Sequence, residues 1–274
     1  MSTLGGFTLR RGIASQGCHA VYQGEDSSGG LVAIRAVCLD AHEDLRQRLD
    51  TELVSLTRLA GAGPAPAVIA DGQNAKLQYL VTQWLPGQTW RAYRKMPDVD
   101  VPRLFAGAAS ALAALHRGGV AHGDLSDNNI VVYDDYTVRF VDFESSVVPD
   151  APAPVGRVPA RVTWRIAAPE LFPPALDGRW ARPTPACDQY SLASLFHRFL
   201  AGDYPRNKPS KDVPGHPPSD FGARPLTGAP ADRWPDLPQV LATALAIDPT
   251  HRYATSEDFA RALHDALPPH PRRD

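Results

Sequence analysis

Three polar residues between positions 122 and 142 have the types and the spacing that phosphoryl transfer needs. Asp124 lies in the stretch 122–129, Asn129 follows it by five positions, and Asp142 comes thirteen positions after Asn129. A carboxylate such as Asp124 can accept the proton of an attacking hydroxyl, while an amide and a second carboxylate can hold Mg²⁺ against nucleotide phosphates. An aspartate beside a glycine can also simply cap a turn. The combination of all three positions favours the catalytic interpretation.

The composition is that of a folded chain without a marked charge. Of 274 residues 43% are hydrophobic, the formal net charge is -2, and only four of the 28 basic residues are lysines. Such a balance gives no reason to expect a nucleic-acid partner. The chain has no apolar run of about 18 residues, no signal-peptide pattern, and three cysteines without a Cys-x-x-Cys pair. We therefore expect a cytoplasmic protein with free thiols and no membrane insertion.

Hydrophobic periodicity divides the chain into a strand-rich start and a mainly helical remainder. Short runs rich in β-branched and aromatic residues dominate before residue 85, and a helical repeat of leucines interrupts them. Nine prolines in residues 203–238 exclude a continuous helix there, so we expect a surface connection, with partner docking as the alternative. Strands are expected at 7–9, 20–22, 31–34, 67–70 and 77–82, and helices at 41–60, 102–117, 186–201, 236–247 and 255–266.

Further motifs, in order along residues 13–266, make the chain resemble the protein kinase superfamily. The resemblance implies an α+β, bilobal fold that forms a single domain. Residues 1–82 would be a small lobe with a five-stranded antiparallel sheet and one helix, 83–87 a hinge, and 88–268 a larger, mainly helical lobe. The matching motifs outside the loop 122–129 are Glu52 in its leucine-rich helix, Asp142-Phe143, Ala168-Pro169-Glu170, the helix start at Asp188, and Arg252.

The resemblance also assigns roles to individual residues. Asp124 would be the catalytic base, Asn129 and Asp142 would hold Mg²⁺, and Arg252 would pair with Glu170. Asp188 would accept hydrogen bonds from the backbone of the catalytic loop. The apolar positions among the expected ATP contacts would also serve as core between the lobes. The expected contacts are Ile13, Val21, Ala33 and Val131 around adenine, Thr82 as gatekeeper, the backbone of Gln83 and Leu85, and Arg35 with Glu52 at the phosphates.

Two departures from the family pattern affect phosphate binding. Arg35 stands where the family has a lysine that contacts the α- and β-phosphates, and its donor geometry differs from that of lysine. Drift in a lysine-poor chain would explain the change equally well. Ala14, Gln16 and His19 take the positions of three glycines whose backbone N–H groups approach phosphates in the family. The sequence therefore predicts a weakened or reshaped phosphate cradle.

Other departures lie in the catalytic and metal loops. Gly123 replaces an arginine that would bind a phosphorylated activation segment, so we expect no need for phosphorylation within 143–167. Ser126 replaces a lysine directed at the γ-phosphate, and Glu144 replaces the glycine after Asp-Phe, which predicts a less mobile metal loop or an extra carboxylate there. His-Gly-Asp-Leu is also similar to aminoglycoside and choline phosphotransferases. Those lack the Ala-Pro-Glu motif and its arginine partner, which favours the protein kinase branch.

The expected function is a slow, ATP- and Mg²⁺-dependent protein kinase-like transfer to Ser or Thr hydroxyls. The sequence does not identify the protein substrate. One alternative is a pseudokinase that binds nucleotide or acts as a scaffold, because Arg35, Ser126 and the altered phosphate loop all depart from the family. The other alternative is a kinase of small hydroxyl compounds.

Overall fold

The computed structural model describes residues 2–60, 63–149, 165–172, 182–206 and 222–268. The expectation for residues 143–167 falls mostly outside these ranges, as does that for residues 207–221 of the proline-rich segment. Within the described ranges, no helix combines the length and the apolar character that crossing a bilayer requires.

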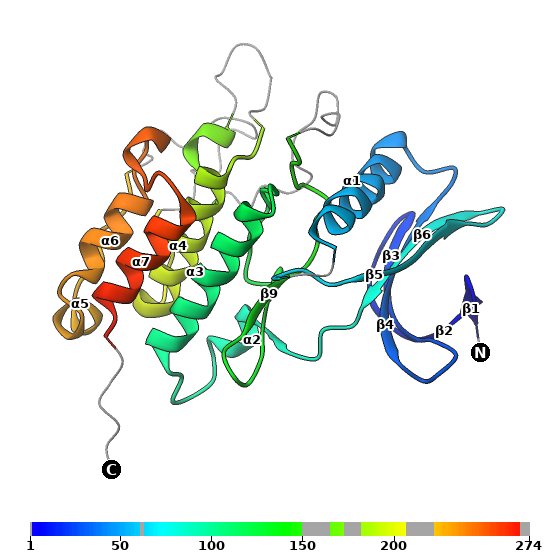
Figure 1. Ribbon diagram of the computed structural model, residues 1–274, viewed down its shortest axis with the longest axis horizontal. Helices are drawn as coiled ribbons and strands as arrows, with labels where there is room; N and C mark the ends of the chain where they lie inside the picture. Colours follow the sequence, from blue (N-terminus) through cyan, green and yellow to red (C-terminus); the bar gives the residue numbers. More distant parts are fainter. Residues whose placement is uncertain (1, 61–62, 150–164, 173–181, 207–221, 269–274) are drawn as a thin grey trace.

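A curled antiparallel sheet of six strands forms one end of the molecule (Figure 1). Each expected strand is present, and the count of five was wrong by one because of an added edge strand. That strand is only two residues long, too short to show a period-two pattern. The strands are β1 (Thr3–Leu4), β2 (Phe7–Gln16), β3 (His19–Glu25), β4 (Leu31–Cys38), β5 (Val68–Gln73) and β6 (Leu77–Gln83), in the order β1-β2-β3-β4-β6-β5.

Helix α1 (Glu43–Leu59) packs against β4, β5 and β6. Its first turn carries Glu43 and Asp44, whose charges favour a helix N-terminus, and it ends at Ala60 in the left-handed conformation. Its buried face includes Glu52 beside leucines such as Leu56. The helical repeat therefore carries one carboxylate into the interior, toward the sheet.

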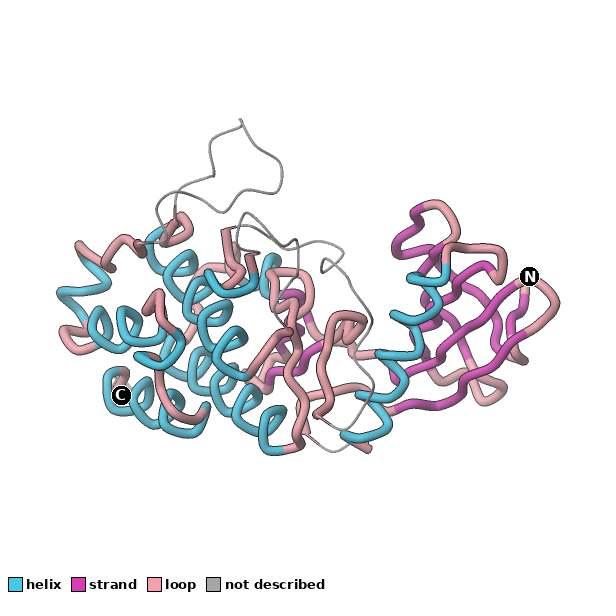
Figure 2. The backbone as a smooth tube through the Cα atoms, turned by 90° about the horizontal axis from the view of Figure 1, so that it is seen from above, coloured by secondary structure: helices cyan, strands magenta, loops and turns pink. Residues whose placement is uncertain are grey.

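The rest of the described chain is mainly helical and lies beside the sheet lobe (Figures 1 and 2). A second, three-stranded sheet lies between the sheet lobe and the helices, and its strand order is β7-β8-β9. All expected helices are present, and the structure adds two short helices without a readable periodicity, α2 and, inside the proline-rich segment, α5. The elements are β7 (Gln88–Thr89), α2 (Trp90–Tyr93), α3 (Val101–Arg117), β8 (Ile130–Val132), β9 (Val138–Phe140), η1 (Pro169–Leu171), α4 (Pro185–Ala201), α5 (Ala229–Arg233), α6 (Leu237–Ala244), η2 (Pro249–His251) and α7 (Ser256–Ala266).

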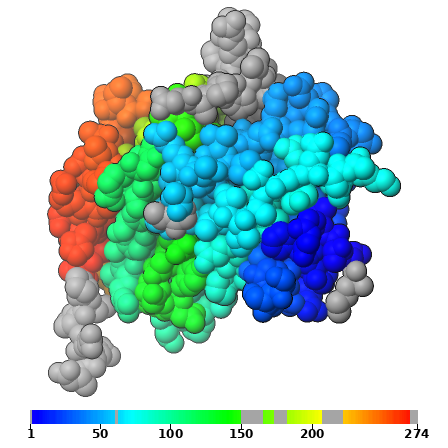
Figure 3. Space-filling model, turned by 45° about the vertical axis from the view of Figure 1, so that its right-hand side comes forward, coloured from blue at the N-terminus to red at the C-terminus, as the bar shows by residue number. Residues whose placement is uncertain are grey.

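One hydrophobic core extends from the sheet lobe into the helices. Leu56 of α1, Phe143 and the stacked rings of Phe105 and Phe196 belong to the same buried cluster. Those two rings lie 4.0 Å apart, and Trp90 packs beside them. In the space-filling view of Figure 3 the cyan part of the chain lies directly against the green α3 and β8–β9 region. The two parts are therefore held in register by shared apolar packing.

Candidate active site

The loop 122–129 is anchored by a buried carboxylate on α4. Asp188 accepts hydrogen bonds from the backbone N–H of His122 at 2.7 Å and of Gly123 at 2.9 Å. His116 of α3 contacts the same carboxylate at 2.9 Å. The prediction that Asp188 holds the loop backbone is confirmed. Because charge-assisted hydrogen bonds to backbone N–H groups are short and strong, the loop is fixed before any ligand arrives.

Backbone geometry explains the glycine before Asp124. Gly123 has φ +79°, and a Cβ built there would lie 2.4 Å from the carbonyl oxygen of Ser145. A side chain at this position would both strain the backbone and push against the segment after Phe143. The absence of an arginine at this position therefore has a local structural cause in this chain.

Asp124 and Asn129 lie at the two ends of the same tight loop. The Asn129 side-chain N–H₂ donates to the backbone carbonyl of Asp124 at 2.9 Å, which leaves the amide oxygen of Asn129 for another ligand. Burial raises the pKa of Asp124 to about 8, helped by the nearby carboxylates of Asp142 and Glu144. A raised pKa makes a carboxylate a stronger proton acceptor once it is ionised.

Arg35 contacts three carboxylates of the site. From β4 its Nε lies 2.8 Å from Glu52 Oε2, its Nη2 2.9 Å from Asp142 Oδ1 and its Nη1 3.2 Å from Glu144 Oε2. The predicted pairing with Glu52 is confirmed. Burial lowers the pKa of the guanidinium, but these three carboxylates together raise it above its ordinary value. Burial raises the pKa of Glu52, and the charge of Arg35 counteracts this rise. Arg35 therefore joins the sheet, helix α1 and the loop of Asp142.

Two basic side chains complete the network. Arg48, one helical turn before Glu52 on α1, lies 3.6 Å from Glu144 Oε1. His19, where the family has a glycine, brings its Nε2 to 3.5 Å from Arg35 Nη1. Burial and the charge of Arg35 lower the pKa of His19, so its ring stays neutral near pH 7. The sequence indicated neither contact, although the four-residue spacing of Arg48 and Glu52 already put them on one helix face.

The charges of the site suit a divalent cation. Four carboxylates lie in the site: Asp142 and Glu144 act electrostatically on both Asp124 and Glu52. Arg35 contacts Glu52, Asp142 and Glu144, and Arg48 contacts Glu144. If all four carboxylates are ionised, two negative charges remain uncompensated. Asp142 keeps about a third of its side chain exposed. Carboxylate and amide oxygens are the ligands that Mg²⁺ takes, so the donor set fits this ion.

Asp142 adopts an unusual backbone conformation, with φ +69°. Aspartate tolerates this region better than most residues, but the conformation still costs energy. The next residue holds it in place. The backbone N–H of Phe143 donates to Glu52 Oε1 at 3.4 Å, and the buried ring of Phe143 packs on His122 with centroids 4.8 Å apart. Phe143 thus packs directly against the first residue of the loop 122–129.

The residues expected around adenine lie on both sheets. Ala33 of β4 is opposite Thr82 of β6, and Val131 of β8 is buried. Among the described residues, the backbone N–H and C=O of Leu85 have no hydrogen-bond partner, although Leu85 is only 8% exposed. Buried backbone groups are normally paired, so this position suits a ligand with a donor and an acceptor edge.

The other residues expected to contact the nucleotide are less buried. Val21 lies on β3 opposite Arg35, and the backbone N–H of Gln83 donates to the carbonyl of Ala67 at 2.8 Å. Ile13 is 48% exposed at a bulge of β2. The structure therefore brings Arg35 into direct contact with both Glu52 and Asp142, and it leaves Ile13 facing solvent.

Two partly buried ion pairs lie in the helical part of the chain. Arg252 contacts both carboxylate oxygens of Glu170, at 2.6 and 2.8 Å, which confirms the predicted pair. The second pair, between Asp127 of the loop 122–129 and Arg198 of α4, was not predicted. Tyr204 adds a hydrogen bond to Asp127 at 3.2 Å. Nothing in the local sequence of Asp127 identifies a partner 71 residues away.

Comparison with known proteins gives two kinds of match. A model of the Phosphotransferase enzyme family matches residues 13–121, which ends just before His122. Serine/threonine-protein kinase PknH of Mycobacterium tuberculosis is 28% identical over 282 residues, covering 97% of this chain and 42% of the relative. PknD of the same organism is 27% identical over 276 residues, covering 97% and 40%. AfsK of Streptomyces coelicolor is 31% identical over 146 residues, covering 51% and 18%.

The chain thus spans less than half the length of these curated relatives. The matches to PknH and PknD run nearly from end to end of the chain, and the fold and the anchored loop agree with them. Together, the family model, the kinase relatives and the fold support a member of the protein kinase superfamily.

Proposed function

We propose that this chain transfers the γ-phosphoryl group of ATP to Ser or Thr hydroxyls of a protein, with Mg²⁺ as cofactor. The observation that carries the proposal is the set of three polar groups: Asp124 and Asn129 on the loop that Asp188 anchors, and Asp142 joined to the sheet through Arg35. A chain that only served as a scaffold would have no chemical need for all three. The names of the two relatives that match 97% of the chain, both serine/threonine-protein kinases, support a Ser/Thr acceptor.

The nucleotide would lie between residues 1–82 as small lobe and 88–268 as large lobe, with 83–87 as hinge. The unpaired backbone groups of Leu85 would bond the adenine edge, and the carbonyl of Gln83 would add an acceptor. Thr82 would stand at the back of the adenine. The apolar residues around the adenine would be Ile13, Val21, Ala33 and Val131.

The chain's own groups would supply positioning and proton transfer. Asp124 accepts the proton of the acceptor hydroxyl as the hydroxyl oxygen bonds to the γ-phosphorus and the bond from that phosphorus to ADP breaks. Asn129, already fixed by its bond to the Asp124 carbonyl, and Asp142 would hold Mg²⁺. Bound Mg²⁺ would neutralise charge on the phosphate oxygens. Arg35 keeps Asp142 oriented through their 2.9 Å contact.

Arg35 also gives a physical reason for a slow enzyme. All three of its nitrogens already contact carboxylates, from Glu52, Asp142 and Glu144. A phosphate would have to compete with these contacts for the guanidinium. We therefore infer that Arg35 acts mainly as a positioning residue for Asp142 and gives the phosphates little direct charge.

The second candidate is a pseudokinase that binds nucleotide without transferring phosphate. The occupied guanidinium of Arg35 favours it, as do Ala14, Gln16 and His19 in the strands flanking the Gly17 turn. His19 in particular places a ring beside Arg35 where the family has a glycine. Intact Asp124, Asn129 and Asp142 favour the enzyme.

An acceptor-competition assay tests the proposed function. The purified chain is incubated with γ-labelled ATP and Mg²⁺ in the presence of a Ser/Thr peptide pool together with choline and an aminoglycoside. We expect label on Ser or Thr side chains. Label confined to the small compounds would contradict the proposed acceptor class. No transfer at all, with ATP still raising the melting temperature, would overturn the enzyme in favour of the scaffold.

A further inference from the structure

Two of the three cysteines lie opposite each other at the end of neighbouring strands. His19 of β3 pairs with Val37 of β4, and the ladder continues one position further because the backbone N–H of Cys38 donates to the carbonyl of Cys18 at 2.9 Å. Cys18 directly follows Gly17, the first residue of the β2–β3 turn. The backbone therefore fixes the two thiol-bearing residues relative to each other.

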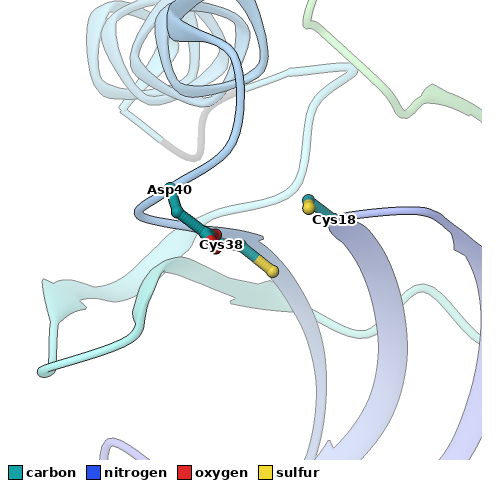
Figure 4. A group of neighbouring side chains, drawn as sticks. All are labelled: Cys18, Cys38 and Asp40. Atoms are coloured by element: carbon teal, nitrogen blue, oxygen red, sulfur yellow. The ribbon is translucent and has the colours of Figure 1, made fainter.

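A tight turn after β4 brings a carboxylate to the same place. The backbone N–H of Ala41 donates to the carbonyl of Cys38 at 3.1 Å, so the chain folds back and places Asp40 near the sulfur of Cys38 (Figure 4). The two sulfur atoms and a carboxylate oxygen of Asp40 all lie within 4.8 Å of one another. Two backbone hydrogen bonds thus hold three potential ligands together before anything binds.

These separations fit a small cation with mixed sulfur and oxygen ligands. With metal–sulfur bonds of about 2.3 Å and metal–oxygen bonds of about 2.1 Å, tetrahedral ligand atoms lie roughly 3.5–3.8 Å apart. Both cysteines are half-buried and Asp40 is exposed, so water can supply a fourth ligand.

We propose that Cys18, Cys38 and Asp40 form a binding site for a borderline-soft divalent cation of the Zn²⁺ class. Two thiolates with one carboxylate suit Zn²⁺ rather than Mg²⁺, which takes oxygen ligands only. The site is distinct from the Asn129 and Asp142 pair in both position and chemistry.

The alternative use of two adjacent cysteines is a disulfide, and Asp40 decides between them. The carboxylate of Asp40 has no part in a disulfide bond, whereas it can serve as a ligand when a cation binds to the two thiolates. All three cysteines of the chain are free thiols in the structure.

The site would affect the phosphate loop. Cys18 immediately precedes His19, which contacts Arg35, and Cys38 ends the strand that carries Arg35. A bound cation would clamp the Gly17–Cys18 turn to the end of β4.

Metal titration of the full reduced chain tests the proposal without relying on enzyme activity. Zn²⁺ alone is titrated into the wild-type chain and into Cys18→Ser, Cys38→Ser and Asp40→Asn variants, with Cys187→Ser as matched control. We expect one equivalent bound by the wild type and by Cys187→Ser. Loss of either sulfur ligand should weaken binding by more than the roughly 10–100-fold that loss of an outer hydrogen-bond partner costs. Asp40→Asn should weaken binding less than loss of either sulfur.

Unmutated protein provides a second readout in case a variant fails to fold. Co²⁺ bound by thiolates gives an intense sulfur-to-metal absorption band, and the wild-type chain should show it at one equivalent. Absence of both this band and stoichiometric Zn²⁺ binding would overturn the proposal. Equal Zn²⁺ affinity of the wild type and folded Cys18→Ser and Cys38→Ser variants would overturn it too.

Discussion

Replacing Asp124 by asparagine should reduce phosphoryl transfer by about 10²–10⁴-fold, because a positioned general base contributes roughly that factor. Asparagine keeps the size of the side chain but cannot accept the proton of the acceptor hydroxyl. The backbone carbonyl that receives the Asn129 bond stays in place. Nucleotide affinity should therefore change little, and the loss should appear in kcat, measured as label transferred from γ-labelled ATP at saturating nucleotide.

Asp134→Asn is the matched control, since this exposed aspartate lies on the β8–β9 hairpin and makes the same chemical change. It should leave the rate unaltered. Equal rates for the wild type and Asp124→Asn would show that Asp124 is not the base.

Replacing Arg252 by methionine should cost about 3–5 kcal/mol of unfolding free energy, because it leaves Glu170 as an unpaired charge in a largely buried setting. The Arg252 side chain is fully buried and also donates to the carbonyls of Ala186 and Ala246. The Glu170 carboxylate and the two carbonyls would all lose the guanidinium as their hydrogen-bond donor. Chemical denaturation of wild type and variant measures the difference.

Arg261→Met provides the comparison for this stability effect. Its pair with Asp258 is exposed, and such pairs contribute about 0–1 kcal/mol. An Arg252→Met variant no less stable than Arg261→Met would mean that the Glu170–Arg252 pair does not brace the large lobe.

The sequence predicted those contacts that recur with a motif. The Glu170–Arg252 pair, the anchoring of the loop by Asp188 and the pairing of Arg35 with Glu52 were all indicated by the order of motifs along the chain. The major helices followed from periodicity, since each buries a wide apolar face. These features depend on local pattern or on the family fold, and both can be read from one sequence.

The remaining contacts of Arg35 could not be predicted in the same way. Asp142 and Glu144 reach it across more than 100 residues, and their approach depends on the left-handed conformation of Asp142. His19 was predicted only as the loss of a glycine, although its imidazole contacts Arg35. Such contacts depend on backbone angles and rotamers set by the assembled core.

The contact between Cys18 and Cys38 could not be predicted either, because it depends on where two strands end. The expected strands at 20–22 and 31–34 stopped short of Cys18 and Cys38, because turn residues and mixed polarity obscure the strand ends. The observed strands run from His19 and to Cys38, and only their register puts the two cysteines opposite each other. An error of a few residues in a strand boundary was enough to hide the cluster.

The most direct test of the central claim, that Arg35 serves a working phosphotransfer site, is the single-turnover transfer rate of the wild type and of Arg35→Lys. Lysine can pair with Glu52, but one ammonium cannot keep separate bonds to Asp142 and Glu144 as well. Loss of a charged hydrogen bond of about 1.5–3 kcal/mol predicts a rate lower by roughly 10–100-fold. Transfer by the wild type that exceeds Asp124→Asn, and a slower Arg35→Lys, would agree with this account. A wild type no faster than Asp124→Asn, or an Arg35→Lys variant faster than wild type, would contradict it.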